Sequence, residues 1–120
     1  MKWLLAVGLF WGLAGCDPGV PVPPLCMAAR AGDTAAIVSL VKTGSDVDER
    51  GGVNNWTALM HAVHKNQPGA VLALIEAGAD VNATAGARGR DTALRLAELQ
   101  GLHEIAEILR DHGAVAEVAN

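Results

Sequence analysis

The chain has 120 residues, enough for one domain and a targeting segment. Its hydrophobic content of 51% includes one Phe and no Tyr, so the core must be built mainly from aliphatic side chains. A formal net charge of −4 argues against a nucleic-acid partner, because such partners bind to a basic face. Two cysteines, Cys16 and Cys26, are too few for a disulfide framework.

The N-terminus has the features of a secretory signal peptide over residues 1–15. Lys2 precedes an apolar run over residues 3–13, which is followed by small residues. The run is shorter than the about 20 residues of a membrane-spanning helix, so we do not expect it to stay as an anchor. Leu13-Ala14-Gly15-Cys16 resembles the lipobox of bacterial lipoproteins, a family in which the chain is cleaved before the cysteine and the cysteine is acylated. The alternative is an ordinary signal peptide that ends beside a cysteine.

Residues 16–24 are expected to form a linker behind the lipidated Cys16. Cleavage would leave 8 basic and 13 acidic residues, a net charge of −5. Four prolines among residues 17–24 favour a semi-rigid extended spacer over a packed element. A single acyl chain gives only marginal membrane binding, whereas several acyl chains on one cysteine bind much more strongly, so the anchor would be stable. The sequence leaves open whether the inner or the outer membrane holds it.

The remainder contains three copies of one pattern, repeated every 34 to 35 residues. The registers are marked by Ala28, Ala62 and Ala97 and, 16 residues later in each copy, by Gly44, Gly78 and Gly113. A period in this range is typical of stacked repeats, in which each copy is one helix–turn–helix unit. The predicted copies are residues 25–55, 56–88 and 89–117, with a tail at residues 118–120.

Local signals predict where the helices of each copy begin and end. Thr57 and Thr92 stand at N-cap positions before helix-forming runs. The three glycines fall where a helix ends in a left-handed residue. Asn66 lies between the two helices of the second copy and accepts left-handed geometry better than most residues.

These motifs resemble ankyrin repeats. Thr57-Ala58-Leu59-Met60 and Thr92-Ala93-Leu94-Arg95 are similar to the opening of the family's pattern, and Gly78-Ala79-Asp80-Val81-Asn82 matches its close. The resemblance covers Pro23 to about Glu117. It implies an all-α solenoid of three helix–turn–helix repeats with loop or β-turn fingers. Cys26, Met60 and Arg95 replace the family's usual histidine, which implies a modestly stable stack.

The third copy is predicted to be a C-terminal cap at which the array stops. Three registers change from apolar to charged in it: Ala29, Val63 and Glu98; Val38, Leu72 and Glu107; Val41, Ile75 and Arg110. We expect Glu107 and Arg110 to pair at i,i+3. The second copy has a neighbour on each side, so the centre of the core should contain Leu59, Ala62, Leu72 and Leu74.

The reactive side chains give little sign of catalysis. His61 and His64 are three residues apart on one predicted helix, but no third ligand lies at a recognisable spacing, so we expect a surface pair. Cys26 shares a register with Met60, which indicates a small packed hydrophobe. We therefore expect no catalytic residue, metal or cofactor. An alternative function of a different class is that of a small metal-binding protein or thiol-dependent enzyme, which would use Cys26 with His61 or His64.

The resemblance also implies a non-catalytic module that binds proteins through its loop tips and the exposed side of its first helices. Transferred by register, this surface contains Arg30, Trp56, His64, Lys65, Asp91, Leu99 and Gln100, and the long loops between the copies add Arg50 and Arg88. Trp56 is the leading candidate, because tryptophan is common among interface hot spots and this one lies outside the aliphatic core register. An equal alternative is that Trp56 covers the loop beside it.

Together these features predict a lipid-anchored protein of the bacterial cell envelope that faces the periplasm. We expect a monomer that binds a periplasmic or envelope protein and no nucleic acid. A narrower alternative is an inhibitor or immunity-type protein that masks an envelope enzyme.

Overall fold

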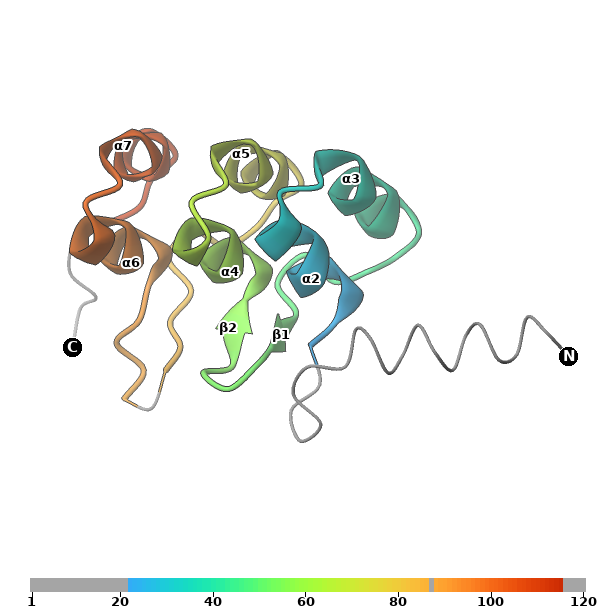
Figure 1. The fold of residues 1–120 in the computed structure, drawn as a ribbon, viewed down its shortest axis with the longest axis horizontal. Coiled ribbons are helices and arrows are strands. Elements are labelled where there is room, and N and C mark those ends of the chain that lie inside the picture. Colours follow the sequence, from blue (N-terminus) through green and yellow to red (C-terminus); the bar gives the residue numbers. More distant parts are fainter. Residues whose placement is uncertain (1–21, 87, 116–120) are drawn as a thin grey trace, which may run out of the picture.

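The computed structural model describes residues 22–86 and 88–115, and these residues form a row of stacked helix pairs. The pairs are α2 (Pro24–Ala31) with α3 (Thr34–Lys42), α4 (Ala58–His64) with α5 (Pro68–Glu76), and α6 (Ala93–Gln100) with α7 (His103–Asp111). In Figure 1, α2, α4 and α6 lie side by side in one row, and α3, α5 and α7 form a second row above it. The loops that join one pair to the next project from the first row. This is the helical solenoid that the period predicted.

The described residues change one predicted boundary and leave others outside. Helix α2 begins at Pro24, one residue inside the predicted linker, because proline suits the first turn of a helix. The predicted signal peptide, Cys16 and the tail at residues 118–120 lie outside the described residues. In the described part of the chain, no helix is long and apolar enough to cross a membrane.

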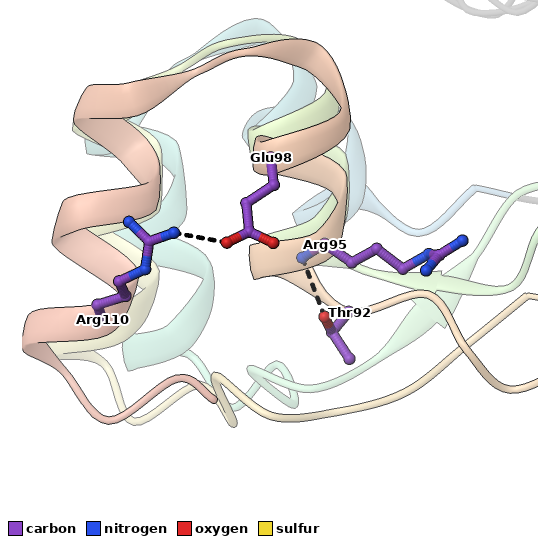
Figure 2. A network of polar contacts seen from close by, with 4 residues as sticks. All are labelled: Thr92, Arg95, Glu98 and Arg110. Atoms are coloured by element: carbon purple, nitrogen blue, oxygen red, sulfur yellow. Dashed lines mark hydrogen bonds and ion pairs between the residues drawn. The ribbon is translucent and has the colours of Figure 1, made fainter. Parts of the chain in front are cut away.

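Both predicted threonine caps are present. The Thr57 hydroxyl accepts a hydrogen bond from the Met60 backbone N–H at 3.3 Å, at the start of α4. Thr92 accepts the equivalent bond from Arg95 at 3.1 Å, at the start of α6 (Figure 2). Each bond satisfies one backbone donor that a helix N-terminus leaves free.

The second helices end at the predicted glycines. Gly44, Gly78 and Gly113 have φ of 107°, 102° and 98°, values that favour glycine. The residue after each glycine donates a backbone hydrogen bond to a carbonyl inside the helix, as the Ala79 N–H does to the Leu74 carbonyl at 3.0 Å. Asn66 also has a positive φ, of 56°, as expected.

The core is aliphatic and runs through all three pairs. Leu25, Leu59 and Leu94 occupy one register of the first helices, and each is at most 1% exposed. Ala62 and Leu74 are also fully buried, as predicted. The prediction for Leu72 is wrong: its side chain is 37% exposed, because it lies on the solvent side of α5.

The outer side of the third pair is polar. Ala29 and Val63 are fully buried, whereas the equivalent Glu98 on α6 is exposed to solvent. Arg110 on α7 forms an ion pair with Glu98 and not with the predicted Glu107 (Figure 2). The packing of α7 against α6 brings this pair together, and an exposed pair of this kind contributes about 0–1 kcal/mol.

One of the three registers used to predict the cap does not face a neighbouring repeat in any copy. Val38 on α3 is 45% exposed, and its equivalents Leu72 and Glu107 are exposed as well. These positions face solvent in every copy, so their change from apolar to charged says nothing about a neighbour.

The N-cap of α4 can be tested by removing its hydroxyl. Thr57→Val should lower the free energy of unfolding by about 1 kcal/mol, because the Met60 N–H loses its partner in a buried position. Urea denaturation followed by circular dichroism measures the loss. Thr34→Val is the control, because Thr34 is exposed on the first turn of α3. Equal effects of the two substitutions would contradict a specific role for the cap.

Candidate functional site

Several of the residues predicted to bind lie in or beside the first finger, which we define as residues 47–57. Its strands β1 (Arg50–Gly51) and β2 (Trp56–Thr57) pair antiparallel, with Gly51 opposite Trp56. The turn between them closes where the Asn55 N–H donates to the Gly52 carbonyl at 3.1 Å. Gly52 and Asn55 both have positive φ there. This hairpin projects below α4 in Figure 1.

The second finger, residues 81–92, is bonded to the first. The Gly86 N–H donates to the Asn54 carbonyl at 3.2 Å. The Arg50 guanidinium donates to the Thr84 carbonyl at 2.7 Å. Arg50 was predicted to contact a partner, and in the folded chain its guanidinium already joins the two fingers.

The base of each finger is tied to the following repeat by one side chain. The Asp48 carboxylate accepts from the Asp80 N–H at 2.8 Å. At the equivalent position 34 residues later, the Asn82 side-chain oxygen accepts from the Val115 N–H at 3.0 Å. These bonds hold successive fingers in one register, so the surface beside them is built on fixed backbone.

Trp56 is packed inside this arrangement. Only 9% of its surface is exposed, and its indole N–H donates to the Asp91 carboxylate at 3.0 Å. The expectation that this tryptophan stands outside the core is therefore wrong. The second finger supplies the partner, and comparing helix registers could not reveal a contact made by a loop. Asp91, another predicted binding residue, is half-buried in the same contact.

His61 is buried as well, so the predicted surface pair is only half correct. It is 7% exposed, and its Nε2 lies 2.9 Å from the Gly51 carbonyl oxygen. Because a carbonyl only accepts, Nε2 must carry the hydrogen. Burial lowers the pKa of His61, and the bond to Gly51 partly opposes that effect. His64, one turn later, is exposed and lies with its ring centre 5.1 Å from that of Trp56.

The structure brings four of the nine predicted binding residues to one hollow of about 240 Å³, which we call the corner pocket. The four are Arg30, Trp56, His64 and Lys65. The pocket lies where the ends of α2 and α4 meet the first finger. The remaining lining residues are Val22, Gly52, Val53, Asn54 and His61.

The other predicted residues lie outside the corner pocket. Leu99 and Gln100 are exposed on α6, and Arg88 is exposed on the second finger. Arg30, His64 and Leu99 occupy the same register of the three first helices, so they form one exposed row.

Sequence reasoning missed the tip of the first finger. Val53 is 78% exposed and lines the corner pocket beside Asn54. The signal was present in Gly51-Gly52 and Asn54-Asn55, since residues of these types favour the positive φ of a hairpin turn.

Cys26 has the environment of a structural thiol. It is fully buried, and its Sγ lies 3.7 Å from the Glu49 carbonyl oxygen. Burial, with a smaller contribution from the negative charge of Glu49, raises the pKa of Cys26 to about 12. The thiol is therefore protonated at neutral pH and a poor nucleophile. Among residues 22–86 and 88–115, no group of three His, Cys, Asp or Glu side chains could hold a metal ion.

Comparison with known proteins agrees with this architecture. The sequence model of ankyrin repeats in three copies matches residues 2–85 and 25–120. The chain belongs to the ankyrin-repeat family. It is similar to the crystal structure of the human ASB11 ankyrin repeat domain, with 28% identity and a TM-score of 0.71. The similarity covers 82% of this chain and 43% of that one, so this chain spans less than half of its length. A search of curated proteins found no match.

Ankyrin repeats are protein–protein interaction modules, and the fold is typically non-catalytic. This agrees with a surface made of exposed helix ends and loop tips on a fixed scaffold. The family assignment gives the general role of the fold and names no partner for this chain.

The buried His61 should make the stability of this ankyrin protein sensitive to acid. Its pKa is lowered in the folded state, so the unfolded chain takes up a proton first as the pH falls through the ordinary value of 6.5. The stabilisation is present above that pH and is lost below it. His61→Gln should therefore weaken the pH dependence of the free energy of unfolding between about pH 7 and 5.

Urea denaturation at several pH values measures this dependence. His64→Gln is the matched control, because it removes an exposed histidine from the same helix. A pH dependence that His61→Gln leaves unchanged would show that His61 does not couple folding to protonation.

Proposed function

We propose that this protein is a lipid-anchored binding module of the bacterial envelope, which engages a periplasmic or envelope protein through one face. We call this the binding face and define it by Arg30, His64 and Leu99 together with the tip residue Val53. The observation that carries the proposal is the exposed row of three side chains at equivalent helix positions, beside an exposed finger tip.

Exposed apolar side chains support the choice of this face. Val53 and Leu99 are 78% and 69% exposed, the highest values among the large hydrophobic residues of the described chain. Single exposed hydrophobic residues are ordinary, but these two accompany the row of Arg30 and His64 on the side of the molecule that the family uses for binding. Arginine is among the side chains that contribute most to the affinity of an interface.

Anchoring at Cys16 would place this face close to a membrane. Pro24, where α2 begins, lies eight positions after Cys16, with seven residues between them. An extended proline-rich spacer of that length spans about 25 Å, at about 3.1 Å for each residue. Such a tether would let the first repeat reach partners at the membrane surface.

A capture experiment tests the binding face. The double substitution Val53→Ser with Leu99→Ser should reduce the partner captured from a solubilised envelope fraction about tenfold, a loss of about 1.4 kcal/mol. Quantitative mass spectrometry measures the captured protein. Trp56→Ala is avoided, because removing a buried tryptophan costs about 3–5 kcal/mol of stability.

The matched control is Val38→Ser with Leu72→Ser, which removes exposed apolar side chains from the second-helix row. Circular dichroism confirms that both double variants fold. Equal capture by the two double variants would show that the partner binds elsewhere.

Anchoring is tested by substituting the thiol. Cys16→Ser should move the protein from the membrane to the soluble fraction, since its acylation would be lost. Cys26→Ser is the control and should stay with the membrane, because Cys26 is buried in the core. Immunoblotting of the separated fractions measures both. A Cys16→Ser protein that still sediments with membranes would contradict the lipid anchor.

A further inference from the structure

The corner pocket collects positive charge in a chain that is acidic overall. Arg30 from the last turn of α2 and Lys65 from the end of α4 both line it, with the exposed His64 between them in sequence. No Asp or Glu is among its described lining residues. The whole chain has 13 acidic and 9 basic residues, so this is a local excess of cations and not the general character of the surface.

These charges affect the pKa of His61, which also lines the pocket. The charged groups that act on His61 are Arg30, His64 and Lys65. Each lowers the pKa of His61 in addition to the larger effect of burial, as positive neighbours do. Arg30 and Lys65, with no acidic residue among the described lining, give the pocket a local excess of positive charge that would attract an anionic group.

The remaining walls are apolar or neutral. Trp56 forms a wall whose polar N–H is already bonded to Asp91, so the ring offers an apolar surface to the pocket. Val22 and the exposed Val53 also line it. With a volume of about 240 Å³, the hollow is below the about 300–1,000 Å³ of typical small-molecule sites and suits one or two side chains.

We propose that the corner pocket binds an acidic side chain, Asp or Glu, presented by the partner protein in a segment that also carries an apolar residue. Arg30 and Lys65 pair with the carboxylate, and Val53 contacts the neighbouring apolar side chain. This assignment rests on the proposed function and names the chemistry of the partner. Inorganic phosphate would satisfy the cations but would leave Trp56 and Val53 without a contact, so a peptide fits the lining better.

Exposed cations of this kind affect specificity and association rate more than affinity. Arg30 and Lys65 are both solvent-exposed, so salt screens them over a Debye length of about 8 Å at physiological ionic strength. Binding should therefore weaken as the salt concentration rises.

The test uses the full chain in mild detergent and a display library of short random peptides. Selected peptides should be enriched in Asp or Glu next to an apolar residue. A selected peptide, labelled and titrated by fluorescence anisotropy, should bind about tenfold more weakly to Arg30→Gln with Lys65→Gln. The same peptide with its acid changed to the amide should lose a similar factor.

The matched control is Lys42→Gln with Arg90→Gln, which removes the same charge from two exposed positions outside the corner pocket. It should bind as the unsubstituted protein does. Selected peptides without acidic enrichment, or equal losses in the two double variants, would overturn the assignment. So would displacement of the peptide by inorganic phosphate alone, which would identify a small-anion site.

Failure of this assignment can be distinguished from failure of the proposed function. If Arg30→Gln with Lys65→Gln still captures the envelope partner at full yield, the acidic contact is wrong, and the apolar residues of the binding face, Val53 and Leu99, are tested by their own double variant. If Val53→Ser with Leu99→Ser also captures it fully, the binding face is wrong as well.

Discussion

The structure depends on the packing of α4 between its two neighbours. Helix α4 has seven residues, and six of them, Ala58 to Val63, are buried. A helix of two turns is marginal in water by itself, because the cost of nucleation is spread over few hydrogen bonds. The contacts of α4 with α2 and α6 replace the stability that its length cannot provide. Alanines at positions 28, 62 and 97 are small enough to let these helices approach closely.

The same stacking assembles the candidate site. The corner pocket combines a residue from α2, residues from α4 and the tip of the first finger, so no single repeat contains it. Trp56 lies in both the core and the pocket lining. Its truncation would remove a large fraction of the about 5–15 kcal/mol by which a domain of ordinary stability is folded. Stability and binding therefore share residues here, and only the exposed rim can be altered without disturbing the fold.

Charge is distributed unevenly over the protein, with functional consequences. The outer side of the third pair carries exposed Arg95 and Glu98, which keeps that end polar, as Figure 2 shows. The corner pocket instead concentrates cations around a buried neutral histidine. An acidic protein with a cationic hollow can repel most anionic surfaces and still attract an acidic group at that place. Cys26 lies in the core beneath this surface and keeps its proton at neutral pH, so it adds no reactivity.

The sequence alone determined the features that depend on a few neighbouring residues. Thr57 and Thr92 cap helices through bonds across three residues, and Gly44, Gly78 and Gly113 end helices through their own φ. The period of these signals predicted the solenoid, and the resemblance of the motifs to ankyrin repeats indicated the family. Tertiary structure decided the contacts between repeats. Trp56 and Asp91 are 35 residues apart, and Arg50 and Thr84 are 34 apart.

The burial of His61 belongs to the same group, because its ring bonds to the Gly51 carbonyl of the preceding repeat. The pairing of Arg110 with Glu98 depends instead on how α7 packs on α6 within one repeat, and the exposure of Leu72 on which side of α5 faces the core. A register comparison treats the copies as equivalent and shows none of these contacts. A finger that folds over its neighbour breaks that equivalence. For this reason the sequence predicted the scaffold and most of the residues on the binding face, whereas only the folded chain brought Arg30, Trp56, His64 and Lys65 into one pocket.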